Sequence, residues 1–323
     1  MFETVGCGIG FWLFPRLPCG CLLALSRLAG WFGWIFLGRE RRIMLANMDV
    51  VFGSRMAWEE KKNIVRRSFQ SVARTSLETL AASRLKGAHF ENHFEFAPGS
   101  LELLKEIIGR KKGLIALTFH YGNWEWLSLA WGMAGYPVTA VAQTIKNPKV
   151  EEMFCRVRQQ MGTRIIPRHH AGRHLFKALK RGESIGLLVD LNSSVEEGGG
   201  FFDFLGLPAM TTRSVGFLAL RTGAPVVCSV ARPLANGRYR IEIGPEIKVD
   251  PQAPVEEEMD RVTCRWLEHC ERLVREQPEC WMWMYKRWKL RPVPEQGRYP
   301  FYSFYDPKAC RVLRGKQPHN LLS

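Results

Sequence analysis

The stretch 113–133 combines a short apolar run, a turn and a helical pattern. Residues 114–119 follow Gly113, are mostly apolar and are too few for a helix, which predicts a buried strand. Gly122 and Asn123 then turn the chain, and residues 124–133 are typical of the helix that follows. The pattern therefore places His120 at the end of a strand.

Short apolar runs continue to alternate with helical patterns beyond this stretch. In chain order we expect a strand at 138–143, a helix at 148–161, a strand at 164–168, a helix at 171–181 and a strand at 184–190. Such alternation indicates βα units and a largely parallel sheet, in which ligands gather at the C-terminal strand ends. We predict an α/β fold with a mixed, largely parallel sheet flanked by helices, and with His120 and Asp190 at those strand ends.

Two long helices and two more strands complete the predicted body of the protein. Residues 59–83 and 256–276 have apolar positions at helical spacing, with basic residues on the other face of the first segment. That basic face either contacts phospholipid or is simply solvated. Residues 225–232 and 238–243 resemble two strands joined by the turn Asn236–Gly237.

The first 38 residues are rich in apolar and aromatic side chains. The best candidate for a membrane span, residues 17–38, carries Arg27 inside, at a cost of about 2.5 to 3.5 kcal/mol at a helix centre. Three arginines follow at once and would keep the body of the protein on the cytoplasmic side: Arg39, Arg41 and Arg42. A single span and a helix lying in the membrane plane both remain open.

We therefore divide the chain into three parts. Residues 1–42 form a hydrophobic membrane anchor with a basic flank, and residues 43–296 form the main domain. Residues 297–323 have no periodic pattern and are expected to be an irregular tail.

The charge of the chain narrows the possible partners. The formal net charge is +15 over 323 residues, which favours nucleic acid, an anionic membrane surface or an acidic protein. Zinc-finger spacing, RNP signatures and helix-turn-helix patterns are missing, so we expect no nucleic-acid partner.

The cysteines and clustered histidines suggest neither a disulfide framework nor a metal site. Nine cysteines lack regular spacing, which favours a reducing compartment. His170 and His174 are one helical turn apart beside His169 and could form a metal pair, but a solvated basic face explains them as well. We expect no metal.

His120 and Glu125 are the candidate catalytic residues. A carboxylate in the first helical turn could hold one imidazole nitrogen and leave the other as a base. The alternative is a structural histidine near a turn, which is the commoner situation for a single histidine.

The segment His-Tyr-Gly-Asn-Trp-Glu, 120–125, resembles the H-x4-E motif of the bacterial lipid A late acyltransferases, the lauroyl and myristoyl transferases. They belong to the glycerolipid (lysophospholipid) acyltransferase superfamily, in which Asp is usual at the last place. Further segments resemble the same family in the right order, across about residues 40–292: 46–52, 188–190, 201–212 and 285–292.

The resemblance implies a membrane-associated enzyme with a glycerolipid acyltransferase-like fold at the cytoplasmic face of the bacterial inner membrane. It would move a fatty acyl group from an acyl carrier protein thioester to a hydroxyl of a lipid A precursor, without a cofactor. His120 would be the general base, with Glu125 holding its tautomer. Attack would be direct in a ternary complex, since no Cys or Ser adjoins His120 and G-x-S-x-G is absent.

The resemblance also suggests residues that bind the substrates. The later arginine and aspartate of the family fall near Arg164 and on Asp190, and Arg164 would bind phosphate or order Asp190. Gly122 and Asn123 are expected to bind the substrates. Backbone N–H groups at the helix start after Gly122 are the expected oxyanion donors, with a nearby arginine as a further possibility. The aromatic and basic cluster 281–291, which includes Lys286 and Arg287, suits lipid headgroups and phosphates as well as a core.

Three alternatives remain. An acyltransferase with another glycolipid or phospholipid acceptor would share the motif, although Glu125 in place of Asp weighs against the glycerol-phosphate branch. A thioester hydrolase would use His120 to activate water. A non-catalytic membrane-binding protein would explain the charge and the aromatic residues alone.

Overall fold

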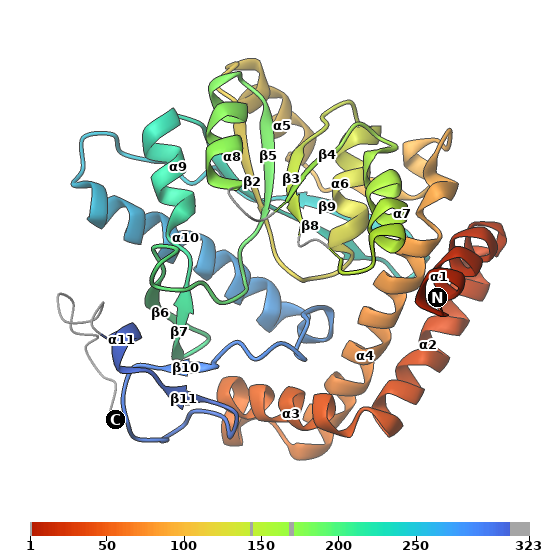
Figure 1. Cartoon of the computed structure of the whole chain (residues 1–323), viewed down its shortest axis with the longest axis horizontal. Coiled ribbons are helices and arrows are strands. Elements are labelled where there is room, and N and C mark those ends of the chain that lie inside the picture. Colours follow the sequence, from red (N-terminus) through yellow and green to blue (C-terminus); the bar gives the residue numbers. More distant parts are fainter. Residues whose placement is uncertain (1, 143–144, 168–170, 311–323) are drawn as a thin grey trace.

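A seven-stranded sheet forms the centre of the computed structural model, which describes residues 2–142, 145–167 and 171–310 (Figure 1). β8 and β9 are antiparallel, and the other neighbouring strands in the sheet are parallel. This confirms the predicted mixed, largely parallel sheet. The strands in spatial order are β1 (Phe94–Phe96), β9 (Tyr239–Ile243), β8 (Val226–Pro233), β2 (Leu114–Thr118), β5 (Ser184–Leu188), β3 (Thr139–Ala142) and β4 (Arg164–Pro167).

Helices cover both faces of the sheet, because successive residues of each strand point to opposite sides. Leu114 and Ala116 of β2 pack with one hydrophobic cluster, and Ile115 and Leu117 pack with the other. The first cluster lies under α5 (Ser100–Gly109), α6 (Trp124–Met133) and α7 (Pro148–Gln159). The second lies under α8 (Ala171–Lys180), α9 (Ser214–Thr222) and α10 (Val255–Glu276).

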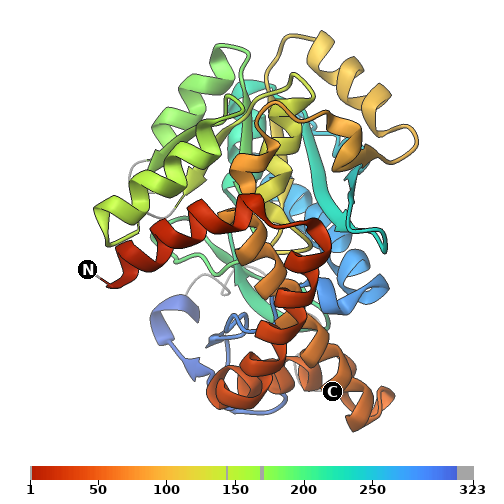
Figure 2. The ribbon, with the colours of Figure 1, turned by 90° about the vertical axis from the view of Figure 1, so that its right-hand side faces the viewer.

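Four N-terminal helices wrap one side of the molecule. They are α1 (Phe2–Leu13), α2 (Cys19–Phe36), α3 (Gly38–Phe52) and α4 (Trp58–Leu80). α2 lies on the outside along α4, and α1 reaches across to α7 (Figures 1 and 2). Within the described ranges, α2 is the one helix long and apolar enough to cross a membrane, by length and composition.

The remaining elements are small. β6 (Gly200–Phe204) and β7 (Leu207–Thr211) form an antiparallel hairpin, and β10 (Leu290–Arg291) pairs in parallel with β11 (Phe304–Tyr305), ahead of α11 (Pro307–Cys310). Short 3-10 turns lie at η1 (Phe14–Arg16), η2 (Gly53–Arg55), η3 (Ala82–Leu85), η4 (Phe90–Asn92) and η5 (Pro278–Cys280).

Residues 297–310 differ from the irregular tail expected there. β11 and α11 lie in this segment, and Tyr299 is buried with its hydroxyl donating to the carbonyl of Pro208 at 2.9 Å. Tyr302 donates to the side chain of Asn47 on α3. Tertiary contacts of individual aromatic side chains therefore order a segment that has no periodic pattern.

Candidate active site

His120 and Asp190 form a hydrogen-bonded pair at the carboxyl edge of the sheet. They follow β2 and β5, which are parallel neighbours with Thr118 beside Leu188. Nδ1 of His120 lies 2.8 Å from Oδ1 of Asp190, and the backbone N–H of His120 donates to Oδ2 at 3.0 Å. Parallel strands end at the same edge, so two residues far apart in the chain meet here. The prediction that both residues lie at C-terminal strand ends is confirmed.

The buried carboxylate of Asp190 fixes the tautomer of the His120 ring. Burial alone raises a carboxyl pKa, but the His120 ring, the indole N–H of Trp281 at 2.9 Å and the His120 backbone N–H together hold the pKa of Asp190 below its ordinary value. An ionised carboxylate can only accept hydrogen bonds, so Nδ1 carries the proton. Nε2 is then the basic nitrogen of a ring that is 15% exposed.

Glu125 differs from the expectation that it holds the His120 ring. Its carboxylate forms a two-pronged ion pair with Arg158 of α7, in which Nε and Nη2 donate at 2.9 and 2.8 Å. Burial alone lowers the pKa of Arg158, but the hydrogen bonds and charge of Glu125 raise it above its ordinary value. Trp124 packs edge-on against the His120 ring, with 5.1 Å between ring centroids. The expected His120–Glu125 pairing is therefore corrected to His120–Asp190, because the first turn of α6 directs Glu125 towards α7.

Gly122 and Asn123 shape the turn between β2 and α6. Gly122 has a φ of +60°, and a Cβ there would lie 2.0 Å from the carbonyl oxygen of Ala231, so only glycine fits. Their backbone N–H groups donate to the carbonyls of Cys280 at 2.9 Å and Ala231 at 3.1 Å. Asn123 caps α6 by accepting from the N–H of Trp126 at 2.9 Å. The N–H groups of Gly122 and Asn123 are therefore used within the protein, and oxyanion donation by the N–H groups that follow them at the start of α6 stays a prediction.

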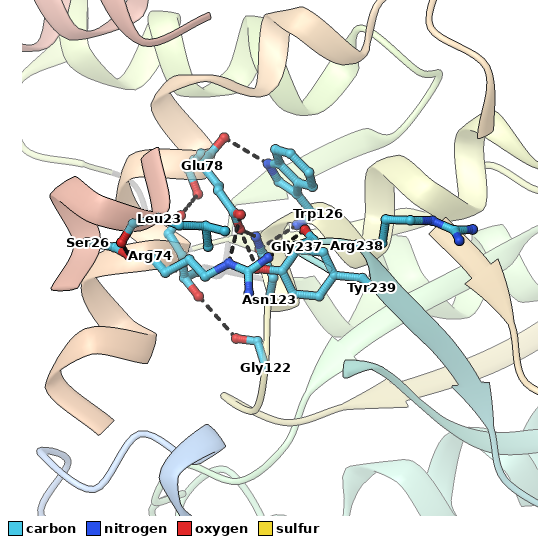
Figure 3. Close-up of polar contacts among 12 residues, drawn as sticks. Leu23, Ser26, Arg74, Glu78, Gly122, Asn123, Trp126, Gly237, Arg238 and Tyr239 are labelled. Atoms are coloured by element: carbon cyan, nitrogen blue, oxygen red, sulfur yellow. Dashed lines mark hydrogen bonds and ion pairs between the residues drawn. The ribbon is translucent and has the colours of Figure 1, made fainter. Parts of the chain in front are cut away.

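A buried polar network on α4 holds this turn in place (Figure 3). The Glu78 carboxylate accepts from Nδ2 of Asn123 at 2.7 Å, from Nε of Arg74 at 2.8 Å and from the hydroxyl of Tyr239. The backbone carbonyl of Glu78 accepts the indole N–H of Trp126 at 2.8 Å. Burial, and then the charge of Glu78, raise the pKa of Tyr239 well above its ordinary value, so its hydroxyl remains a donor.

The segment after α10 closes the other side of the site. The backbone N–H of Met282 donates to the carbonyl of His120 at 2.9 Å, and Tyr121 forms an antiparallel bridge with Trp281. Ser68 of α4 donates to the carbonyl of Trp281 at 2.9 Å. Trp281, whose indole N–H donates to Asp190, is thus bonded both to the strand end that carries His120 and to α4.

An apolar cavity lies between the sheet and helices α6 and α7. His120 and Asp190 do not line it, but Trp124, which packs against the His120 ring, does. About 630 Å³ of the cavity is free of protein atoms, and part of this space is open to solvent. Leu127 and Leu188 are among its apolar walls, while Thr118, Glu125 and Arg158 add polar groups. Oγ1 of Thr118 and Nη1 of Arg158 are buried and have no hydrogen-bond partner among the residues that the structure describes.

Arg164 lies at the opposite end of the sheet from His120. It is exposed and begins β4, beside Thr139 at the start of β3. The pKa of Glu183, next to the start of β5, is lowered by its hydrogen bond to Arg181 and also by the charge of Arg164. The expectation that Arg164 orders Asp190 is contradicted.

Arg287 is a structural residue and not an exposed phosphate ligand. It is 1% exposed and donates to Asn192 Oδ1 at 2.9 Å, to the Met210 carbonyl at 2.6 Å and to Thr211 Oγ1 at 2.6 Å. Burial lowers its pKa. Lys286 is half-buried, and its backbone carbonyl accepts Nδ2 of Asn192 at 3.0 Å. The predicted phosphate-binding role is therefore contradicted for Arg287, and stays a prediction for Lys286.

The tryptophans of the predicted aromatic and basic cluster belong to the core. Trp281, Trp283 and Trp288 are buried in the second hydrophobic cluster.

The predicted histidine cluster is only partly described, because His169 and His170 lie outside the described residues. In the described part of the chain, no group of three or more His, Cys, Asp or Glu side chains could hold a metal ion.

Three residues that build the site were missed by the sequence reasoning. Arg158 and Trp281 reach it from other elements, and no local motif signals either contact. The sequence contains a weak indication that Glu78 is paired. Glu78 lies one helical turn after Arg74 and next to the apolar positions of the helix predicted at 59–83. A carboxylate beside an apolar stripe indicates a buried partner.

Comparison with known proteins agrees with the resemblance of the motif. The chain matches the family described as "Bacterial lipid A biosynthesis acyltransferase" over residues 5–290. It is 24% identical over 295 residues to the lipid A biosynthesis palmitoleoyltransferase and equally to the lauroyltransferase of Escherichia coli, with 90% of this chain and 93% of each relative covered. It is 20% identical over 234 residues to a lipid A biosynthesis acyltransferase of Haemophilus influenzae, covering 72% and 71%. The suspected relationship is confirmed, and the chain belongs to the bacterial lipid A biosynthesis acyltransferase family.

Proposed function

We propose that this acyltransferase moves a fatty acyl chain from an acyl carrier protein thioester to a hydroxyl of a lipid A precursor, with His120 as general base. The reaction takes place at the cytoplasmic face of the bacterial inner membrane and uses no cofactor. The observation that carries the proposal is the His120–Asp190 pair, which contacts an apolar cavity through Trp124, in a chain of the lipid A acyltransferase family.

His120 supplies the step that the acceptor most needs. Nε2 takes the proton of the hydroxyl while its oxygen attacks the thioester carbonyl, forming the new C–O bond. Collapse of the tetrahedral intermediate breaks the C–S bond, and the imidazolium returns its proton to the thiolate. Asp190 stabilises the imidazolium in between. A thiol of pKa near 8.5 leaves readily as a thiolate. One base is therefore enough, because the difficult step is the deprotonation of the acceptor hydroxyl.

Direct transfer agrees with the surroundings of His120. The carbonyl of Cys280 accepts the N–H of Gly122, two residues after His120. Burial raises the pKa of Cys280 to about 12, which leaves almost no thiolate at neutral pH. An acyl-enzyme on this thiol is therefore disfavoured.

Arg158 is the proposed donor to the carbonyl oxygen of the thioester. Its Nη1 is buried at the cavity with no partner among the described residues, while Nε and Nη2 are held by Glu125. A fixed cation at this place would stabilise the negative oxygen of the tetrahedral intermediate. Glu125 then acts through Arg158 and not through His120.

The cavity is the proposed site of the acyl chain. Its walls combine apolar side chains from β2, β3, β5 and α6, and they include Trp124, which contacts the His120 ring. An acyl chain in the cavity would place its carbonyl close to Arg158. The depth of the cavity would then select the chain length.

The basic excess of the chain suits both substrates. A formal net charge of +15 favours an acidic carrier protein, a phosphorylated lipid and an anionic membrane surface. Exposed charge interactions weaken with ionic strength, so the activity should fall as salt rises.

The experiment is mass spectrometry of lipids after the purified protein is incubated with acyl carrier protein thioesters and a lipid A precursor. We expect an acylated lipid, and a loss of roughly 10²- to 10⁴-fold in rate for His120→Ala. His89→Ala is the matched control, because the side chain of His89 is 81% exposed, and it should keep wild-type activity.

Two results would contradict the proposal. Release of free fatty acid at the same rate with and without acceptor lipid would indicate a thioester hydrolase. Wild-type acyl transfer by His120→Ala would remove the general base from the mechanism.

A further inference from the structure

α2 presents one face to α4 and the opposite face to the outside of the molecule (Figure 2). Leu22, Ser26 and Gly30 are its buried residues. We propose that α2 lies in the plane of the membrane surface, with its outer face in lipid and its inner face on α4, and that it does not cross the bilayer. This inference rests on the membrane association in the proposed function and specifies its geometry.

The inner face of α2 is locked onto α4. A Cβ added at Gly30 would lie 2.6 Å from Cα of Gln70, and one at Gly33 would lie 2.9 Å from the ring of Phe69. Small residues at such positions let two helix backbones approach closely. Substitution at Gly30 would force the backbones apart, so this contact requires α2 and α4 to stay together.

The outer face of α2 is apolar. Successive helical residues are about 100° apart, which places Leu28, Trp31 and Ile35 opposite the buried residues. These side chains are 51%, 54% and 40% exposed. Arg27 is exposed on the flank between the two faces. An in-plane helix would therefore place only apolar groups in lipid and keep Arg27 at the water boundary.

A crossing helix would bring polar groups of the body into hydrocarbon. The guanidinium of Arg66 on α4 lies 4.6 Å from the ring of Trp34, and Arg84 donates to the carbonyl of Leu17 at 3.2 Å, so basic residues flank both ends of α2. Gln70 lies against its middle. Arg27 itself would be near the bilayer centre, at a cost of about 2.5 to 3.5 kcal/mol. An 18-residue helix of about 27 Å is also slightly shorter than a typical hydrocarbon core of about 30 Å.

The neighbouring surface has the composition of a membrane interface. α1, which precedes α2 in the chain, exposes Ile9, Trp12 and Leu13. At the other end of α2, Trp58 and Phe301 line a hollow with basic residues, namely Arg41 and Arg42. Aromatic residues favour the headgroup level, and arginines favour anionic lipids. The occupant of this surface is therefore an anionic lipid bilayer.

Labelling from the two sides of the membrane tests the orientation. The substitutions Arg16→Cys and Arg39→Cys, at two exposed positions at opposite ends of α2, are each made in a variant that keeps only the buried Cys228, Cys270 and Cys280. In this variant serine replaces Cys7, Cys19, Cys21, Cys155, Cys264 and Cys310. A membrane-impermeant maleimide is applied to spheroplasts and to inverted vesicles. We expect both positions to react in inverted vesicles and neither in spheroplasts. Reaction of one position from each side, or of either position only after detergent is added, would overturn the proposal.

Vesicle binding tests the proposed lipid face directly. Trp31→Glu should lower binding to vesicles of anionic phospholipid at least tenfold, because it places a charge in the lipid-facing row. Phe217→Glu is the matched control, since Phe217 is 43% exposed on α9 and away from α2. Equal binding by the two variants would contradict the assigned face. Acyl transfer in detergent micelles, measured on the same samples, tests the proposed function separately and should be unchanged by Trp31→Glu.

Discussion

Two carboxylates near His120 have different roles. Asp190 is 2% exposed, follows a strand and holds the His120 ring. Glu125 lies in the first turn of a helix, is 22% exposed and holds Arg158 at the cavity. The first pair is set by the register of two neighbouring parallel strands. The second is set by the direction of a helix start. Spacing in the chain favours Glu125 as the partner of His120, but the sheet brings Asp190 closer.

Asp190→Asn should have the largest effect of the substitutions that separate the two carboxylates. We expect kcat to fall about 10³- to 10⁴-fold with little change in KM, because a neutral amide neither stabilises the imidazolium nor selects the required tautomer. Steady-state kinetics with the thioester donor measures this. Asp203→Asn, at an exposed position of β6, is the control and should behave as wild type. Activity near wild type in Asp190→Asn would place the base elsewhere.

Glu78→Gln tests whether the strand-end pair depends on the network of α4. The free energy of unfolding should fall by about 3 kcal/mol, because Arg74 would lose its buried charge partner. Chemical denaturation measures the change. Glu102→Gln, exposed on α5, should stay within about 0.5 kcal/mol of wild type. Equal stability of the two variants would show that the network carries little energy.

Glu125→Gln should reduce kcat/KM by roughly 10- to 100-fold, less than Asp190→Asn, because it releases Arg158 but leaves the His120–Asp190 pair intact. Arg158→Gln should have a similar effect. In the double variant the two losses should not add, since both remove the same interaction. Fully additive losses would mean that Glu125 and Arg158 act independently.

The smallest expected effect is that of His269, which packs near His120, on the pH dependence of the free energy of unfolding. His269 of α10 lies against Phe119, with 6.4 Å between ring centroids, and burial followed by the charge of Arg272 lowers its pKa to about 4. The unfolded chain, with a histidine pKa near 6.5, binds the proton more readily. Neutral His269 should therefore contribute its full share to the free energy of unfolding above pH 6.5. The free energy of unfolding should fall by about 2 kcal/mol between pH 6.5 and 4, which is less than the pKa difference alone would give because the ring is partly exposed. The comparison of unfolding curves for wild type and His269→Gln checks this, because the variant should lose that part of the slope.

Most of the fold could be predicted from the sequence because it follows from local patterns. The helix predicted at 59–83 is α4, the helix at 256–276 is α10, and the strands joined at Asn236–Gly237 are β8 and β9. The apolar run at 114–119 correctly located β2. Strand and helix periodicity depends on burial of one face, which neighbouring residues reveal.

The site was predicted less completely because its contacts are made between distant elements. His120 and Asp190 could be placed at C-terminal strand ends, but the direction of Glu125 depends on Gly122, whose positive φ turns the chain before α6. The sequence left Arg287 between a phosphate ligand and a core residue. It is 1% exposed, and three acceptors from other segments hold it there. No local pattern reports such partners.

Nuclear magnetic resonance of the His120 ring nitrogens tests the central claim most directly, at a pH where the ring is neutral. With Asp190 as the partner, the proton should reside on Nδ1 and Nε2 should be unprotonated. This signature should persist in Glu125→Gln and disappear in Asp190→Asn. A proton on Nε2 in the wild type, or loss of the Nδ1 signal in Glu125→Gln, would contradict the assignment of Asp190 as the residue that prepares His120 for catalysis.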